Sequence, residues 1–130
     1  MIELDFQFQT TQINLYCCDH PFMNDTVKMD EFLEELVNFI DMNKIPKKLM
    51  GRDNPHSIDF KPDYLANSEW GVTGNIIMAE SHIHAHSFPN KKGFCNIVIT
   101  SCKPYDSDEA LLWILKYTNA TVYRMETMKF

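Results

Sequence analysis

The sequence predicts an α+β two-layer sandwich, in which two helices pack on one face of a mainly antiparallel sheet. Two observations lead to this prediction. Short strand-like runs alternate apolar and polar residues or are continuously apolar, whereas two other runs repeat their apolar residues at helical spacing. Along the chain these runs follow the order strand, helix, strands, helix, strand, which favours helices packed against a sheet. The 130 residues fit one domain, residues 1–130.

The first part of the chain contains one predicted strand and the clearest helix. Residues 13–17 alternate apolar with polar or aromatic side chains, which indicates a strand with one buried face. His20-Pro21 then interrupts this strand. A helix is expected from Asp25 or Thr26, because either side chain can cap its first turn. Acidic residues are expected on its solvent face, and its apolar face consists of Met29, Phe32, Leu33, Leu36, Val37 and Ile40.

The middle of the chain is predicted to form antiparallel strands. A polar region with several prolines follows the helix, and within it only residues 57–60 resemble a strand. Residues 70–74 have the composition of a turn that leads into a strand at 75–79. The segment 89–93 has hairpin-loop chemistry, and residues 94–101 alternate as the returning strand.

The last part of the chain is predicted to form a second helix and a final strand. Asp106 or Ser107 can cap the helix, and Asn119 is expected to end it. Residues 121–125 close the chain as a strand. The apolar face of this helix is formed by Leu111, Ile114 and Leu115.

Charge and composition argue against several classes of protein. The formal net charge is -6, which argues against nucleic-acid binding because phosphate neutralisation needs a concentrated basic face. No apolar run approaches the roughly 20 residues that cross a membrane, and the first residues lack a basic segment followed by an apolar one. We therefore expect a soluble, cytoplasmic protein that binds neither nucleic acid nor membrane.

The four cysteines, Cys17, Cys18, Cys95 and Cys102, include no CxxC pair. Reduced thiols are the usual state in the cytoplasm. Cys17 and Cys95 lie in strand-like runs, so we expect both to pack in the core as small apolar residues.

The segment most suited to chemistry is Glu80-Ser81-His82-Ile83-His84-Ala85-His86, which follows an apolar run. Side chains two residues apart share one face of a strand. His82, His84 and His86, together with Glu80, could therefore ligate zinc or a similar metal. Histidines on a solvated strand face are the simpler interpretation, and the metal site stays an alternative hypothesis.

The order of several short motifs supports a different hypothesis. Between residues 71 and 102 the chain reads Gly71-Val72-Thr73-Gly74, Glu80-Ser81-His82, His86, Phe88-Pro89 and Ser101-Cys102. In this order the segment resembles the prokaryotic S-adenosylmethionine decarboxylases, which are small pyruvoyl-dependent enzymes of spermidine synthesis. The specific match covers about a quarter of the chain. Outside it, only the pattern of elements agrees with the family.

The resemblance implies a proenzyme that cleaves itself between Glu80 and Ser81. In the family, the serine hydroxyl attacks the carbonyl of the preceding glutamate, the amide becomes an ester, and elimination splits the chain. The pyruvoyl cofactor left at the new terminus would derive from Ser81. By the same resemblance, His86 removes a proton during elimination, and Thr73 stands where a serine stabilises the tetrahedral intermediate.

For the decarboxylation, the resemblance implies a Schiff base between the substrate amine and the pyruvoyl ketone, which takes up the charge left when carbon dioxide departs. Cys102 matches the cysteine that returns a proton to the substrate. The family's enzymes are homodimers with composite arrangements of the processed chains. A homodimer that acts on S-adenosylmethionine is therefore expected.

The residues expected to bind substrate depart from the family pattern. Asn90 stands where the family has an acidic residue for the ribose hydroxyls, and an amide lacks the two-oxygen acceptor. Phe88 keeps an aromatic ring, and Trp70 is the aromatic beside the glycine turn, but residues 67–69 offer no match for the ring that stacks on adenine. His84 is unusual for the family. Two alternatives therefore stay open: a pyruvoyl-dependent decarboxylase of arginine or ornithine, and an unprocessed, non-enzymatic homologue.

Overall fold

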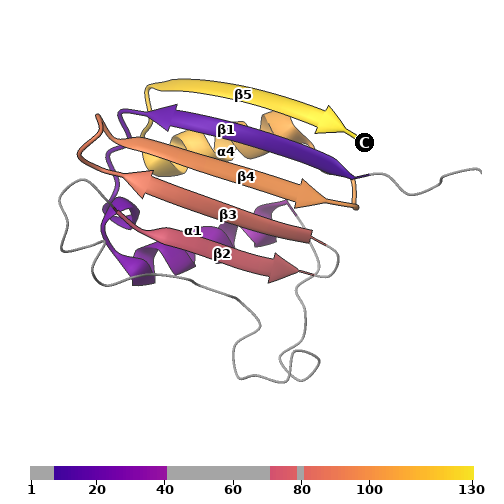
Figure 1. The fold of residues 1–130 in the computed structure, drawn as a ribbon, viewed down its shortest axis with the longest axis horizontal. Helices are drawn as coiled ribbons and strands as arrows, with labels where there is room; N and C mark the ends of the chain where they lie inside the picture. Colours follow the sequence, from indigo (N-terminus) through magenta and orange to yellow (C-terminus); the bar gives the residue numbers. More distant parts are fainter. Residues whose placement is uncertain (1–7, 41–70, 79–80) are drawn as a thin grey trace, which may run out of the picture.

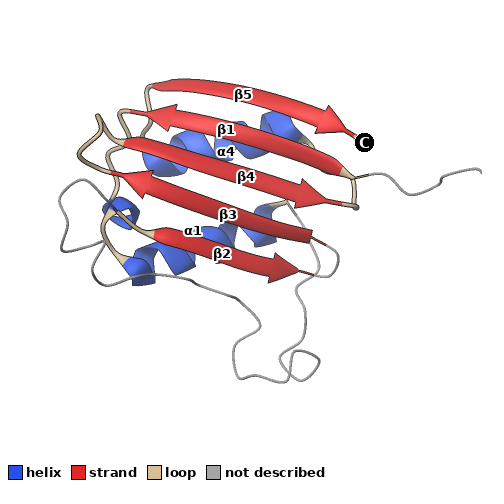
Figure 2. Ribbon diagram, in the orientation of Figure 1, coloured by secondary structure: helices blue, strands red, loops and turns tan. Residues whose placement is uncertain are grey.

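A computed structural model describes residues 8–40, 71–78 and 81–130 and confirms the α+β two-layer sandwich (Figure 1). Within these residues the sheet is five-stranded and antiparallel throughout, with the order β2-β3-β4-β1-β5. Both helices lie on the same side of it (Figure 2). The elements are β1 (Gln9–Tyr16), a 3₁₀ turn η1 (Pro21–Met23), α1 (Thr26–Phe39), β2 (Thr73–Met78), β3 (Ser81–Phe88), β4 (Phe94–Ser101), α4 (Ser107–Thr118) and β5 (Val122–Lys129).

The sheet has one covered and one uncovered face because side chains alternate along each strand. In β3 and β4 the odd-numbered residues are buried and the even-numbered ones are half-buried. The buried side chains pack with those of α1 and α4 in one hydrophobic core, to which the sheet contributes Ile13, Leu15, Ile76, Ile83, Ile97 and Ile99. We call the other side the open face; it carries the even-numbered residues of β1, β3 and β4.

The helix ends follow the predicted capping residues. The Asp25 carboxylate accepts hydrogen bonds from the backbone N–H groups of Val27 and Lys28, at 2.9 and 3.1 Å. Asp106 caps α4 in the same way. Asn119 ends α4 in the left-handed conformation, with φ of 56°, as is common for asparagine at the end of a helix. No helix in the described part of the chain is long and apolar enough to span a membrane.

Strand boundaries differ from the predicted ones by a few residues. The predicted strand at 75–79 corresponds to β2, which starts two residues earlier, and the strand at 121–125 extends to Lys129 as β5. The strand at 94–101 is confirmed as β4. The predicted short strand at 57–60 lies outside the described residues.

The prediction for Cys17 is wrong, whereas Cys95 is buried as expected. Cys17 is exposed and has a φ of 59°. Its backbone N–H donates to the Lys92 carbonyl at 2.8 Å, and the N–H of Cys18 donates to Gly93 at 3.0 Å. These bonds tie the end of β1 to the β3–β4 turn, so the chain leaves the strand before Cys17 can point inward.

The two glycines of the Gly71-Val72-Thr73-Gly74 motif are required by close packing. A Cβ atom on Gly71 would lie 2.6 Å from the Ser87 carbonyl oxygen and 2.7 Å from that of Met23. A Cβ atom on Gly74 would lie 2.8 Å from side-chain carbons of Leu33 and Met29, on α1. Backbone neighbours crowd Gly71, whereas flexible side chains crowd Gly74.

Replacing these glycines tests this difference. We expect Gly74→Ala to lower the free energy of unfolding by about 1–3 kcal/mol, because the side chains of Leu33 and Met29 can shift. Gly71→Ala should lower the free energy of unfolding by more than Gly74→Ala does, because the carbonyl oxygens that crowd Gly71 are backbone atoms. Urea denaturation followed by circular dichroism measures both values. An equal loss in the two variants would contradict the packing described for Gly71.

Candidate active site

Strand β3 carries the predicted nucleophile at its first residue. Ser81 lies on the helix-covered face, with 8% of its surface exposed. Its hydroxyl donates a hydrogen bond to the hydroxyl of Ser101, at 2.8 Å. Ser101 is the last residue of β4, is fully buried and lies directly opposite Ser81 in the strand register. The two serines therefore form a buried pair at one end of the sheet.

Cys102 lies at the same end of the sheet as this pair. It follows Ser101 directly, beyond the last residue of β4, and its side chain is half-buried. Glu80, the other half of the predicted cleavage bond, lies outside the described residues. Three chemically active side chains, Ser81, Ser101 and Cys102, thus belong to one end of the β3–β4 pair.

A second group of predicted residues lies at the other end of β3. Thr73, predicted to lie in a turn, is the first residue of β2 and is the register partner of His86. Thr73 Oγ1 and His86 Nδ1 are 3.1 Å apart, within hydrogen-bonding distance. Burial lowers the pKa of His86 below its usual value, which favours the neutral imidazole. The pair thus offers a hydroxyl and a neutral ring nitrogen on the open face.

A buried serine fixes the position of this second group. Ser87 lies between His86 and Phe88 but faces the helices, and its hydroxyl donates to the Met23 carbonyl at 2.8 Å. The same hydroxyl accepts a hydrogen bond from the backbone N–H of Val72 at 2.7 Å. Because Val72 precedes Thr73, this contact holds the start of β2 beside β3. Sequence reasoning missed this role of Ser87, for which the only signal is its position in a strand-like run.

Within one chain, the structure does not bring Ser81 and His86 together. They are separated by five residues of one strand, which at about 3.4 Å per residue corresponds to about 17 Å. Five is an odd number, so the two side chains also lie on opposite faces of the sheet. Thr73 and His86 therefore form one half of the predicted site, and Ser81 and Cys102 form the other.

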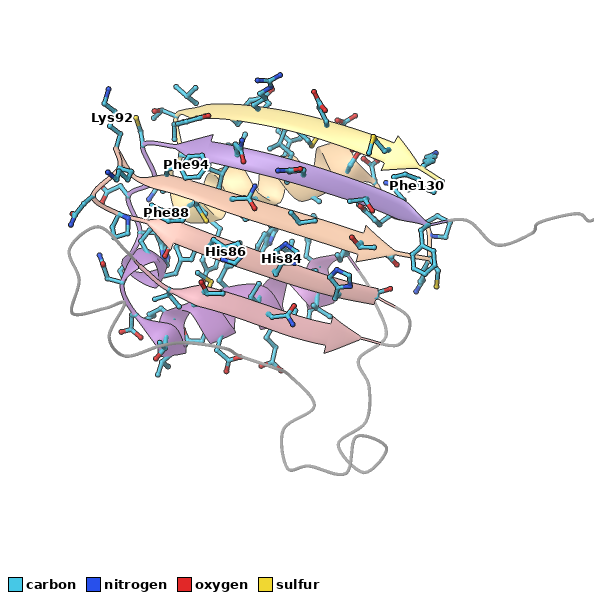
Figure 3. All side chains as sticks on the ribbon, in the orientation of Figure 1. His84, His86, Phe88, Lys92, Phe94 and Phe130 are labelled. Carbon is cyan, nitrogen blue, oxygen red and sulfur yellow. The ribbon has the colours of Figure 1, made fainter. Side chains whose placement is uncertain are left out.

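The three histidines share the open face, as the alternating pattern predicted. Figure 3 shows His84 and His86 on the side of the sheet away from the helices. The ring centroids of His82 and His84 are 5.8 Å apart, and those of His84 and His86 are 5.5 Å apart. Among the residues that the structure describes, no three metal-ligating side chains are placed to hold a metal ion. His82, His84 and His86 form a row along β3 rather than a convergent set of metal ligands.

The described residues expected to bind substrate lie near His86 rather than near Ser81. Phe88 is half-buried on the open face, and its ring centroid is 5.8 Å from that of Phe94 (Figure 3). Tyr16 extends this aromatic cluster, with its centroid 5.3 Å from Phe94. Asn90 is exposed in the turn between β3 and β4. Trp70 lies outside the described residues.

The histidine row predicts a pH dependence of stability. Burial lowers the pKa of His84, and the charges of His86 and His82 lower it further. As the pH falls below the ordinary histidine pKa of about 6.5, the unfolded chain binds protons before the folded one, so the free energy of unfolding decreases. We expect this decrease, measured by urea denaturation between about pH 7.5 and pH 5, to be smaller in His84→Gln.

His20 and His86, whose pKa values burial also lowers, are present in both proteins, so the difference between the proteins reports on His84 and its interactions with the other two histidines of the row. An identical loss of stability in the two proteins would show that His84 does not resist protonation in the folded chain.

Comparison with known proteins places the chain in a family. The family model for S-adenosylmethionine decarboxylase matches residues 9–129. The S-adenosylmethionine decarboxylase proenzyme of Pyrococcus horikoshii is 30% identical over 91 residues, which are 68% of this chain and 65% of that protein. The proenzyme of Saccharolobus islandicus is 27% identical over 111 residues, which are 85% of this chain and 77% of the relative. The chain thus matches slightly less than two thirds of the length of the Pyrococcus protein.

A solved structure shows the same fold. The adenosylmethionine decarboxylase from Aquifex aeolicus superposes with a TM-score of 0.72 and 18% sequence identity, covering 96% of this chain and 91% of that one. This likeness concerns the fold alone. Because the family model matches nearly the whole chain, the protein belongs to the S-adenosylmethionine decarboxylase family.

Proposed function

We propose that this protein is a pyruvoyl-dependent S-adenosylmethionine decarboxylase that activates itself by cleavage between Glu80 and Ser81. One observation carries the proposal beyond family membership. The bond to be cut lies between the end of β2 at Met78 and the start of β3, where the Ser81 hydroxyl is held by a hydrogen bond. Cutting there opens a connection and leaves the β2–β3 pairing in place.

The residues present fit the formation of the cofactor. In the first step the Ser81 Oγ bonds to the Glu80 carbonyl carbon, the C–N bond breaks, and an ester forms. In the second step a base removes the α-proton of Ser81 and the bond between Cβ and Oγ of Ser81 breaks, which releases the longer fragment, residues 1–80, with Glu80 as its carboxylate end. Water then replaces the remaining nitrogen, which leaves as ammonia, so the shorter fragment, residues 81–130, begins with a pyruvoyl ketone.

His86 and Thr73 are suited to the base and oxyanion roles in these steps. In the tautomer whose Nδ1–H donates to Thr73, the Nε2 atom of His86 carries a lone pair that can accept a proton. The lowered pKa of His86 keeps that nitrogen unprotonated near neutral pH. The Thr73 hydroxyl then keeps its own proton to donate to a developing oxyanion.

For decarboxylation, the pyruvoyl group would supply an electron-accepting ketone. Cys102 lies beyond Ser101 at the Ser81 end of the sheet and is half-buried there, which suits a thiol that returns a proton to the substrate. The aromatic rings of Phe88 and Phe94 offer a stacking surface for adenine and for the sulfonium charge. Asn90 would contact the ribose through an amide rather than a carboxylate.

We further propose that the working site is composite and requires a homodimer. His86 cannot reach Ser81 of its own chain across about 17 Å. A two-fold axis perpendicular to the strands reverses their direction, and so places the His86 end of one protomer beside the Ser81 end of its partner. The half-buried aromatic cluster of Tyr16, Phe88 and Phe94 on the open face gives a second copy an apolar surface to cover.

We place this dimer in the cytoplasm, where the four free cysteines stay reduced.

Intact mass under denaturing conditions tests the cleavage. We expect the purified protein to separate into two fragments divided between Glu80 and Ser81, with the smaller, residues 81–130, carrying the mass of a pyruvoyl end. Ser81→Ala should remain a single chain without decarboxylase activity, because only the nucleophilic hydroxyl is removed. Its melting temperature serves as the control for folding. A wild-type chain that stays intact after days at working temperature would contradict the proposal.

Co-expression of Ser81→Ala and His86→Ala chains tests the composite site. In a mixed dimer, one site combines the intact Ser81 of one chain with the intact His86 of the other. About half of the dimers would be mixed, and each would have one complete site, so about a quarter of the wild-type sites should recover. The readout is cleavage of the His86→Ala chain, together with release of carbon dioxide from S-adenosylmethionine.

Each variant expressed alone is the control for this experiment, and both should lack complete sites. If the His86→Ala chain is cleaved no faster beside Ser81→Ala chains than alone, the two residues act within one chain and the composite site is wrong.

A further inference from the structure

We infer that Ser101 is a positioning residue for self-cleavage, and that it directs the Ser81 hydroxyl for attack on the peptide bond. The inference rests on the proposed function, because it concerns the first step of that function. It does not follow from the roles assigned above to Thr73, His86 and Cys102.

The contacts of Ser101 give the Ser81 hydroxyl one direction. Ser101 Oγ accepts a hydrogen bond from the backbone N–H of Lys103, at 2.9 Å. It also accepts the hydrogen bond from Ser81 Oγ, at 2.8 Å. A hydroxyl oxygen has two lone pairs, so these two donors use both. Ser101 therefore acts as a hydrogen-bond acceptor toward Ser81.

This polarity favours the reaction. Because the Ser81 proton points toward β4, the lone pairs of its oxygen face away from Ser101 and are available to a carbonyl carbon. A serine side chain otherwise occupies three rotamers, and only some of them bring Oγ toward the preceding peptide. Holding one rotamer and one proton direction removes that entropy from the barrier.

The step itself balances within the chain. The Oγ of Ser81 bonds to the carbonyl carbon of Glu80, the C–N bond between the two residues breaks, and the hydroxyl proton ends on the released amine. Ser101 gains and loses no atom in this exchange. It acts only by orienting the hydroxyl before the bond forms.

A purely structural role for the pair predicts a different result. Buried hydroxyl groups generally have partners, and removing Ser101 Oγ takes the acceptor from both Ser81 and the Lys103 amide. Such a loss lowers stability without selecting one chemical step. A decisive test must therefore measure the rate of cleavage and the step that is blocked, as well as the melting temperature.

The test follows cleavage of the full-length chain over time by intact mass for wild type, Ser101→Ala and Ser101→Cys. The cysteine variant keeps nearly the shape of serine but offers only a weak acceptor. We expect both variants to be cleaved at least roughly tenfold more slowly than wild type. Thr118→Val is the matched control, because Thr118 is another fully buried hydroxyl, bonded to the Ile114 carbonyl within α4. It should lower the melting temperature and leave the cleavage rate unchanged.

Hydroxylamine identifies the blocked step, because it cleaves esters and leaves amides intact. If Ser101 directs ester formation, hydroxylamine should not split the uncleaved Ser101→Ala chain. It should split a His86→Ala chain, in which the ester forms and elimination is blocked. If Ser101→Ala does not fold, Ser101→Cys gives the same comparison.

The outcomes separate the two proposals. If the wild-type chain is cleaved and the Ser101 variants are cleaved at the same rate, only the inference about Ser101 is overturned. Rapid splitting of Ser101→Ala by hydroxylamine also overturns it, because the ester has then already formed. A wild-type chain that never cleaves overturns the proposed function itself, together with this inference.

Discussion

The two-residue repeat of β3 is the constraint on which the candidate site depends. Its odd-numbered side chains, from Ser81 to Ser87, fill the space beneath the helices, and its even-numbered histidines face outward. Any shift of the strand by one residue would expose Ile83 and bury histidines, so the core fixes which face each residue occupies. Ser81 and His86 are five residues apart and therefore lie on opposite faces. A chain that carries both groups on this strand holds half a site at each end.

The two ends of the strand are held by different means. At the His86 end, the Ser87 hydroxyl and the close approach of Gly71 fix the start of β2, so that Thr73 lies beside His86. At the Ser81 end, the contact is the serine pair with β4. In both places a buried serine on the helix-covered face controls the position of a group that is proposed to react. The structural and chemical roles of this strand are thus divided between neighbouring residues.

Most of the fold could be predicted because its signals are local. Asp25 and Asp106 cap helices through their own side chains, and the alternation in residues 94–101 marks a strand without reference to any partner. Cys17 was misplaced because the end of β1 is set by hydrogen bonds to Lys92 and Gly93, far away in sequence. The shared face of the histidines followed from their spacing. The pairing of Ser81 with Ser101 did not, because strand register depends on packing across the sheet.

Under the proposed function, the change at Asn90 bears on substrate choice and not on processing. In the proposed function, self-cleavage needs only protein groups: Ser81, its partner Ser101, and the pair of Thr73 and His86. Asn90 is exposed in the β3–β4 turn, two residues beyond Phe88, and belongs to the end of the sheet where substrate aromatics would stack. In that function, an amide in place of an acidic residue there would change how a ribose is held and would leave the proposed cleavage groups unaltered. Under the proposed function, we therefore expect this asparagine to leave cofactor formation unchanged and to alter only the affinity for the nucleoside part of the substrate.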